Sequence, residues 1–487
     1  MMKYVADLHI HSKYARSCSN RLDVENIWKS CIFKWIDIIW TWDFTHPSRL
    51  NELKQSLVED WTWFLVPKQD LLQKRISELK PFLNHEVLQN VEKWFYPRFV
   101  LQTEINSNFE RNSKKYRIHN CILIDSFANA DKILEYLSWF GKVESDGRLT
   151  VKQDQTETLL WLKQNFPSSV FFSWHIWTPY FGVLWSKYGF DSMSKAYWSS
   201  LSLIDAIETW LSSDPIMNWI NPEIDNLTIL SNSDAHSPEN FAREANIFET
   251  KNKTFPTYKD LEKAIKNRKF DKNFQNLHEV EKQYLTDLFA VKTDLKLVWT
   301  IEFYPQEGKY FWDGHSKCNF LTTPSDTIRR NWLCPICGKK LIVWVFHRSF
   351  DIWDNKRISQ IHFGEKDFWK QEEINEIAKI FDRPNYQYIV PLWDIIREVF
   401  AANKWTKKAD KTYNELLLQF GTEFDILLNL KIDKATEYNK FFGYALEKVR
   451  NSEIFIKPWY DGVFGVVSIK EVDTPESEKK IMQEGLF

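Results

Sequence analysis

Short apolar runs alternate with amphipathic stretches from residue 1 to about residue 245. Seven of these runs have the length and composition of buried strands, and they cover residues 4–6, 36–41, 98–103, 116–118, 170–173, 203–207 and 227–230. Helix-like segments or loops separate them, as after Leu22, where Ile27, Cys31 and Ile32 recur at helical spacing. Seven strands alternating with helices predict an α/β fold, built either in layers or as a barrel.

Side chains that can bind a metal ion follow each of the seven runs. In chain order they are His9 with His11, Asp43, Glu104, His119, His175, Glu208, and Asp234 with His236. The carboxyl ends of the strands in a β/α barrel face one common crater, where active sites are built. His9 and His11 are two residues apart on a strand end, so their imidazoles point the same way. Each residue alone could be an ordinary hydrogen-bonded group, but the repetition favours a metal cluster with imidazole and carboxylate ligands.

The alternation of apolar runs and amphipathic stretches ends near residue 245, and the second half of the chain is predicted to be mainly helical. Residues 250–299 are rich in lysine and predict a helical connector. Amphipathic helices are predicted at 372–381, 392–402 and 413–420, followed by a strand-like tail around the turn Asp461-Gly462. We therefore expect a barrel over residues 1–249, the connector, a small zinc-binding module over 300–350, and a mainly helical C-terminal domain over 351–487.

The zinc module is predicted from four clustered ligands. His315 and Cys318 are spaced H-x2-C, and Cys334 and Cys337 form a C-x2-C pair fifteen residues further along. This two-pair spacing is typical of a structural zinc site, with one histidine replacing a cysteine. Four ligands leave no open position, so the ion would be structural. Six cysteines in 487 residues do not suggest a disulfide scaffold.

Charge and hydropathy narrow the possible partners. The formal net charge of −2 gives no global attraction to nucleic acid, so such a partner would have to be held by local patches. The chain runs directly into its first strand without a signal segment, and no stretch approaches the ~18 apolar residues of a membrane span. We expect a cytoplasmic protein with no membrane partner.

Several motifs resemble a known family. The segments 7–11 and 233–236 are similar to those of the polymerase-and-histidinol-phosphatase (PHP) domain, and the segments 41–47, 175–179, 208–209 and 231–236 resemble one branch of it, endonuclease Q. The segments 308–310 and 313–315, the zinc module and the tail segment 460–463 resemble that branch as well. The wider family has an aspartate within the stretch corresponding to 14–18, and a histidine where Asp43 stands. Both departures favour two ions over three.

The resemblance implies a distorted (β/α)7 PHP barrel that holds two or three divalent ions, Zn, Mn or Mg, for phosphoester hydrolysis. It implies a DNA-repair endonuclease that cuts 5′ to a deaminated base (uracil, hypoxanthine or xanthine) or an abasic site. Damaged DNA is the expected partner, and a replication sliding clamp is a further candidate. The expected metal ligands are His9, His11, Asp43, Glu104, His119, His175, Asp234 and His236, of which His9, His11, Asp43, Asp234 and His236 are also expected to be catalytic.

Four further residues are candidate substrate contacts. Arg16 and Lys187 lie in loops that could reach the scissile phosphate, and Trp177 belongs to an aromatic stretch that could line a pocket for a base outside the stack. Glu208 is the fourth. Two alternatives remain open: a small-molecule phosphatase, which would need only the first 245 residues, and a DNA-binding repair scaffold with an inactive barrel.

Tryptophan and glycine are present in unusual amounts. The chain has 24 Trp and 13 Gly, which together make about 7.6% of the residues, close to the ~7% that glycine alone usually contributes. The clearest Trp at positions where endonuclease Q-like proteins have Gly are Trp35, Trp40, Trp42, Trp185, Trp210, Trp344, Trp405 and Trp459. This pattern predicts that a UGA codon decoded as glycine has been translated as tryptophan. True tryptophan enrichment is the alternative.

Overall fold

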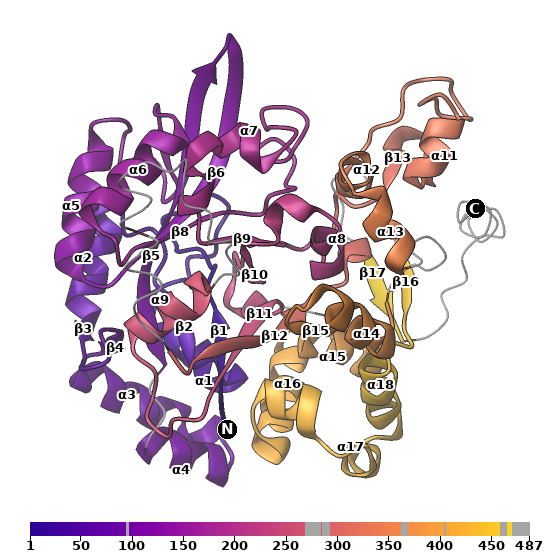
Figure 1. Ribbon diagram of the computed structural model, residues 1–487. Coiled ribbons are helices and arrows are strands. Elements are labelled where there is room, and N and C mark those ends of the chain that lie inside the picture. The colour runs from indigo at the N-terminus through magenta and orange to yellow at the C-terminus, as the bar shows by residue number, and fades with distance from the viewer. Residues whose placement is uncertain are drawn as a thin grey trace.

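The structure, a computed structural model, describes residues 1–93, 97–267, 284, 293–361, 369–403, 406–457 and 465–469. Within this part of the chain, a curled sheet of 13 strands runs through the N-terminal half and continues into the C-terminal region (Figure 1). Its strand order is β10 (Thr228–Leu230), β9 (Ala206–Glu208), β8 (Val170–Ser173), β6 (Lys114–Ile124), β5 (Arg98–Arg111), β2 (Ile38–Trp40), β1 (Met2–Asp7), β11 (Ala245–Thr250), β12 (Lys296–Glu302) and β15 (Asn385–Tyr388). Three short strands lie beside this path: β3 (Leu57–Glu59), β4 (Leu65–Pro67) and β7 (Leu149–Val151).

The predicted α/β fold with a distorted barrel is confirmed, and each of the seven predicted strands is present. Strands β1, β2 and β5 are parallel, as are β8, β9 and β10. Strand β6 runs antiparallel to both of its neighbours, β5 and β8. In the described residues the sheet is a curled half-barrel that is open between its end strands, β10 and β15. It departs from a regular barrel also because its strands do not all run in the same direction.

Helices of the N-terminal half flank this sheet, with α2 and α5 along its left side in Figure 1. They are α1 (Val24–Lys34), α2 (Pro47–Ser56), α3 (Gln69–Leu79), α4 (His85–Lys93), α5 (Phe127–Ser138), α6 (Gln155–Asn165), α7 (Met193–Tyr197), α8 (Pro215–Trp219) and α9 (Tyr258–Lys266). Helix α1 begins after Asp23, whose carboxylate accepts a hydrogen bond from the backbone N–H of Asn26. It buries Ile27, Cys31 and Ile32 against the sheet, as their helical spacing predicts.

The predicted connector differs from the structure at its end. Residues 250–299 include helix α9, but residues 296–299 form the first half of β12, and residues 268–283 and 285–292 lie outside the described part. Strand β12 pairs antiparallel with β11 and parallel with β15, so pairing across the sheet decides its conformation. The expected boundary at 299–300 therefore falls inside a strand.

The C-terminal half contains the small hairpin β13 (Asp313–His315) and β14 (Phe320–Thr322), followed by helices and a second hairpin. The helices are α11 (Pro324–Arg329), α12 (Val345–Asp351), α13 (Asn355–Ile361), α14 (Gln371–Phe381), α15 (Leu392–Phe400), α16 (Lys407–Phe420), α17 (Ile432–Tyr438) and α18 (Lys440–Arg450). Helices α14, α15 and α16 overlap the three predicted ones. The second hairpin is β16 (Phe455–Lys457) with β17 (Val466–Ser468), and the predicted turn at Asp461-Gly462 lies outside the described residues.

A buried ion pair connects the barrel to the helical region. Lys34 Nζ at the end of α1 lies 3.0 Å from Glu423 Oε2, and both side chains are at most 5% exposed. Tyr413 of α16 donates its hydroxyl to the same carboxylate oxygen at 2.7 Å. Glu423 is therefore satisfied from both sides of the junction. In the described part of the chain, no helix combines the length and apolar character needed to cross a bilayer.

Asp37 generates a prediction about stability and pH. Its Oδ2 accepts a hydrogen bond from Val5 N at 2.8 Å, but burial dominates and raises the pKa of Asp37 to about 7. Because the folded pKa exceeds the unfolded value, the folded state holds a proton that the unfolded chain has lost between about pH 4 and 7, and stability falls as pH rises through this window. We expect Asp37→Asn, which keeps the acceptor oxygen, to flatten this slope and to add about 1–4 kcal/mol at pH 8. Denaturant unfolding at pH 4.5 and pH 8 measures the effect, and an unchanged pH slope would contradict it.

Candidate functional site

Two segments far apart in the sequence meet at the carboxyl ends of β1 and β10. Ile10 and Ala235 form an isolated parallel bridge, and the N–H of His11 donates to the carbonyl of Ala235 at 3.0 Å. The N–H of Leu8 donates to Asn232 Oδ1 at 2.9 Å. These bonds fix the segment that carries His9 and His11 beside the segment that carries Asp234 and His236.

Asp7 joins the same two segments from within the core. Its Oδ2 accepts hydrogen bonds from Ser233 Oγ at 2.6 Å and from the N–H of Ala242 at 2.8 Å, and its Oδ1 accepts from Ser233 N at 3.1 Å. Burial raises the pKa of Asp7 to about 6, although these hydrogen bonds oppose the shift. The sequence offered no role for Asp7, because its partners lie more than 200 residues away.

The first group of potential metal ligands is His9, His11 and Asp234, whose donor atoms all lie within 4.8 Å of one another. His9 Nε2 and His11 Nε2 lie 3.0 Å and 2.7 Å from the same oxygen, Asp234 Oδ1. His236 and Cys18 extend the group, since both lie within the same distance of His11. Cys18 is only partly buried and is a ligand candidate that its sequence context did not indicate.

The second group is Glu104, His119 and His175. His119 Nδ1 pairs with Glu104 Oε1, and His175 Nε2 lies 3.7 Å from that oxygen and 3.3 Å from His119 Nδ1. Glu104 and His119 lie inside the long antiparallel pair β5–β6 and do not follow strand ends as predicted. The rings of His9 and His175 are 6.1 Å apart, which makes the two groups neighbours in one buried site.

The charges of the two groups depend on each other. Burial opposes a charged imidazole, but the carboxylates of Glu208 and Asp234 outweigh it and raise the pKa of His9 to about 10. Burial also opposes the charge of Asp234, yet His9 and His236 hold the pKa of that carboxyl well below its usual range. The carboxyl of Glu104 has a lowered pKa because His119 outweighs its burial. Both acids are therefore ionised and able to bind cations at neutral pH.

The donor atoms of these residues fit divalent ions. Among the described residues, His11 Nδ1 and His175 Nδ1 are buried without a hydrogen-bond partner. Buried polar atoms are almost always satisfied, so two unsatisfied ring nitrogens in one site indicate a missing partner. Imidazole with carboxylate suits zinc or manganese.

Asp43, the remaining expected ligand, lies next to the two groups without belonging to either. Its Oδ2 accepts a short hydrogen bond from Ser12 Oγ, and burial raises its pKa well above the usual value. Asp43, His175 and Asp234 have φ angles of 59°, 27° and 46°. Positive φ in non-glycine residues is uncommon and often occurs where a functional site imposes strain.

Glu208 orients two of the candidate ligands, His9 and His175. Its Oε1 lies 2.8 Å from His9 Nδ1 and accepts a hydrogen bond from Asn232 Nδ2 at 2.9 Å, while Oε2 accepts from the N–H of His175 at 3.1 Å. A carboxylate on the far nitrogen of a ligating histidine fixes the orientation of its ring. Glu208 was expected to contact the substrate, but it is fully buried and positions the ligands instead.

The other candidate substrate contacts differ in accessibility. Trp177 is 1% exposed and donates its Nε1 to Asn218 Oδ1 at 2.9 Å, so it packs inside the protein and does not line an open pocket. The Arg16 side chain is 80% exposed and lies 3.4 Å from Asp146. Lys187 is exposed, with its Nζ 5.6 Å from the ring centroid of Tyr180.

Arg148, which the sequence analysis did not single out, points its guanidinium toward the crater. Its Nε lies 3.8 Å from Glu104 Oε2, and the charges of Glu104 and Asp234 outweigh burial to raise its pKa. The preceding residue is Gly147, where a Cβ would collide with the carboxylate of Asp43. Close backbone approach at Gly147 therefore brings Arg148 to the site.

The predicted structural zinc ligands also come together. His315, Cys318, Cys334 and Cys337 form one group within 4.8 Å, with His315 Nδ1 3.5 Å from Cys337 Sγ. Gly338 has a φ of 70° and donates its N–H to the carbonyl of Cys334 at 2.8 Å. This turn aims both knuckle cysteines at the histidine on β13.

Comparisons with known proteins identify similar folds and one partial relative. Residues 391–453 match the family described as the MJ0043 C-terminal domain. The chain is 26% identical over 270 residues to the uncharacterized protein MJ0043 of Methanocaldococcus jannaschii, an alignment that spans 55% of this chain and 28% of that protein. The chain therefore covers less than a third of this curated relative.

Two solved structures match almost the whole chain. A lesion-specific endonuclease Q from Pyrococcus furiosus is 22% identical, with a TM-score of 0.71 and 99% of both chains covered. An endonuclease Q complex with a 27-mer duplex carrying an abasic lesion at the active site is also 22% identical, with a TM-score of 0.71, 96% of this chain and 97% of that chain covered. The resemblance seen in the motifs is thus confirmed at the level of the fold: this chain has the fold of endonuclease Q over nearly its entire length.

Proposed function

We propose that this protein is a metal-dependent endonuclease that hydrolyses a DNA phosphodiester 5′ to a deaminated base or an abasic site. The observation that carries the proposal is the convergence of two buried ligand groups, around Asp234 and around Glu104, in one crater. The fold shared with a lesion-specific endonuclease, and with one whose complex holds an abasic duplex, supports the substrate class.

The chain's own residues would hold and orient the reacting groups. His9, His11 and Asp234 would hold one ion, and Glu104, His119 and His175 another, with His236 and Asp43 completing the set. Bound divalent ions would activate water and offset the charge on the phosphate. Glu208 holds the imidazole ring of His9 and the backbone N–H of His175 in place. Arg148 is about 30% exposed at the crater and is positioned to contact a phosphate oxygen.

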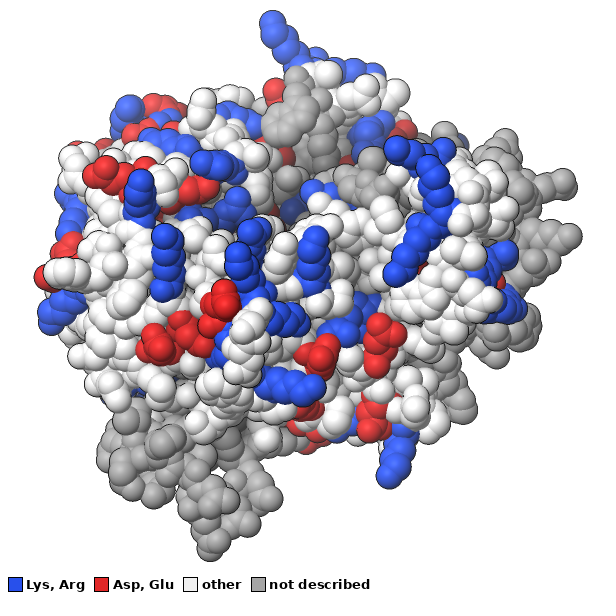
Figure 2. Space-filling view, turned by 90° about the horizontal axis from the view of Figure 1, so that it is seen from above, with Lys and Arg blue, Asp and Glu red and all other residues white. Residues whose placement is uncertain are grey.

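A nucleic-acid path across the surface is consistent with the charge distribution. Figure 2 shows Lys and Arg side chains spread over the face that lies at the top of Figure 1, with Asp and Glu in smaller groups between them. Local basic patches of this kind hold phosphates without a large net charge on the whole chain.

Two structural features favour a nuclease over the alternatives. Strand β15 of the C-terminal half pairs with β12, so the helical region continues the barrel's sheet, whereas a small-molecule phosphatase would need the barrel alone. Complete ligand groups argue against an inactive scaffold. The test is to incubate the protein with end-labelled duplexes that contain uracil, hypoxanthine, xanthine or an abasic site, together with Mg²⁺, Mn²⁺ or Zn²⁺.

Replacing a ligand should abolish cleavage while the fold is retained. We expect Asp234→Asn and His9→Ala to lower the rate of nicking at least about 100-fold. Mutation of a residue that only hydrogen-bonds to a metal ligand already lowers metal affinity or activity by about 10–100-fold, and loss of a ligand itself should cost more. Duplex binding, measured by fluorescence anisotropy, should change little. Exposed Asp70→Asn and His85→Ala are matched controls that should cut normally. Wild-type nicking by either ligand variant would disprove the assigned centre.

Glu208→Gln tests the positioning role separately from catalysis. The amide keeps the shape but loses the charge that orients His9, so we expect Mn²⁺ affinity at the crater to fall by about 10–100-fold. Calorimetric titration of the protein with Mn²⁺ measures this change. Glu110→Gln, at an exposed position on β5, is the control. Equal Mn²⁺ affinity in wild type and Glu208→Gln would exclude the role.

Cys334→Ser tests the structural zinc. Zinc binding contributes folding free energy to its module, so we expect this variant to lose one zinc per chain and to bind DNA more weakly, with the barrel still folded. Elemental analysis and circular dichroism measure these two effects. Cys31→Ala, buried in α1, should keep its zinc. Unchanged zinc content in Cys334→Ser would rule the site out.

A further inference from the structure

In the part of the chain that the structure describes, six tryptophans have a φ angle in the left-handed region. Tryptophan makes up about one residue in twenty of the chain, so about one would be expected among the twenty non-glycine residues with positive φ. Such a φ is a genuine outlier for a bulky side chain, whereas glycine adopts it at no steric cost. The six are Trp35 (φ 65°), Trp42 (53°), Trp63 (62°), Trp198 (49°), Trp210 (65°) and Trp332 (64°).

Two of the six occupy positions that glycine usually takes. Trp35 follows the last residue of α1 with φ 65° and ψ 60°, and its N–H donates to the carbonyls of Cys31 and Ile32. Helices commonly end in this way, with glycine at the left-handed residue. Trp198 follows α7 with φ 49° and ψ −130°, near the conformation of the first central residue of a type II′ turn, where glycine is the rule.

Two indoles lie inside the metal crater. Trp42 stacks on the ring of His9 with centroids 4.9 Å apart and lies 4.1 Å from the ring of His11. Trp174 also stacks on His9, with its ring centroid 3.3 Å from that of His9 and 4.6 Å from that of Trp42. Both are fully buried, and within the described residues neither Nε1 has a hydrogen-bond partner. A buried donor without a partner is costly, and here it lies among atoms that should bind ions.

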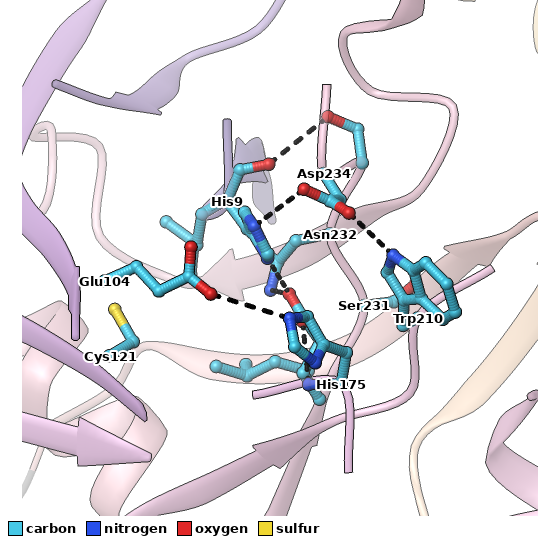
Figure 3. A network of polar contacts seen from close by, with 12 residues as sticks. His9, Glu104, Cys121, His175, Trp210, Ser231, Asn232 and Asp234 are labelled. Carbon is cyan, nitrogen blue, oxygen red and sulfur yellow. Dashed lines mark hydrogen bonds and ion pairs between the residues drawn. The ribbon is translucent and has the colours of Figure 1, made fainter. Parts of the chain in front are cut away.

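A third indole competes directly for a candidate ligand. Trp210, also at positive φ, donates its Nε1 to Asp234 Oδ2 at 2.8 Å (Figure 3). That oxygen would otherwise be free to bind an ion. Glycine at 42, 174 and 210 would remove three buried indoles from the crater and leave its histidines and carboxylates in place.

Three other tryptophans have the contacts that are usual for a buried indole. Trp177 donates its Nε1 to Asn218 Oδ1, and Trp353 donates its own to the carbonyl of Met217 at 3.1 Å. Trp393 stacks on Tyr413 with centroids 4.2 Å apart. None of these three has a positive φ. The backbone anomaly, a positive φ, is therefore confined to particular tryptophans among the described residues.

We infer that the protein made in its own cell has glycine at positions 35, 42, 63, 174, 198, 210 and 332, because UGA codons read here as tryptophan are decoded there as glycine. The combined share of the two residues, close to that of glycine alone, supports the same reading. Translation with tryptophan then yields a chain whose metal crater is filled by its own side chains. The inference concerns which residues are present, and it holds whether or not the proposed nuclease activity is correct.

Mass spectrometry of the native protein decides the matter. A digest with trypsin should release a peptide from the region 35–49 in which positions 35 and 42 are glycine. Tryptophan at either position would overturn the inference. The peptide that contains Trp177 serves as an internal control, since tryptophan is expected there.

The tryptophan form, expressed as it stands, gives a second test. We expect W35G and W198G each to raise the midpoint of thermal unfolding, since each relieves backbone strain, whereas the control W28G, within α1, should lower it. The double variant W42G/W174G should bind more Mn²⁺ per chain than its parent, with zinc at Cys334 unchanged. This last measurement rests on the proposed metal centre. A gain in stability for W35G and W198G without any gain in Mn²⁺ would refute that centre and keep the inference, whereas a loss of stability in both would refute the inference.

Discussion

The buried carboxylate of Asp7 holds together the two segments on which the site depends. Asp7 lies 226 positions from Ser233 and 235 from Ala242, and its three hydrogen bonds from these two residues anchor the loop after β10 to the end of β1. A buried carboxylate that lost these donors would pay a desolvation cost of about 1–3 kcal/mol or more. The geometry of His9 and Asp234 is therefore enforced by a residue that is not itself a ligand.

Next to the contacts of Asp7, the carboxylate of Glu208 stabilises the two groups of candidate ligands. Glu208 holds His9 through one oxygen and the backbone of His175 through the other, so one side chain links both ligand groups. The positive φ of His175 is held in place by the hydrogen bond that its own N–H donates to Glu208. Such a site is preorganised: its ligands are placed by the folded protein before any ion or substrate arrives.

Because the ligands are held in fixed positions, the side chains packed against them affect whether an ion can bind. The segments that deliver Asp43 and His175 each place a fully buried tryptophan next to His9, Trp42 in the first and Trp174 in the second. Left-handed backbone at residue 42 is part of the turn that presents Asp43, so the turn requires a conformation that an indole-bearing residue rarely adopts. Backbone geometry and side-chain space thus lead to the same conclusion about this position.

Features that depend on short spacings were predictable from the sequence. A period of two placed His9 and His11 on one face, and the spacing of Cys334 and Cys337 predicted a metal-binding pair that the structure brings to His315 and Cys318. The seven strands were recognisable because each coincides with a short, mainly apolar run. Helical spacing likewise predicted which face of α1 is buried.

How these pieces meet depends on contacts between distant segments. The first half of β12 was assigned to a helical connector because the partners of this strand, β11 and β15, are not its sequence neighbours. Glu208 looked like a substrate contact until its oxygens were seen on His9 and His175, and Arg148 and Cys18 enter the crater from loops without a motif. Local patterns are set by the geometry of a few consecutive residues, whereas contacts between residues hundreds of positions apart depend on the folding of the whole chain.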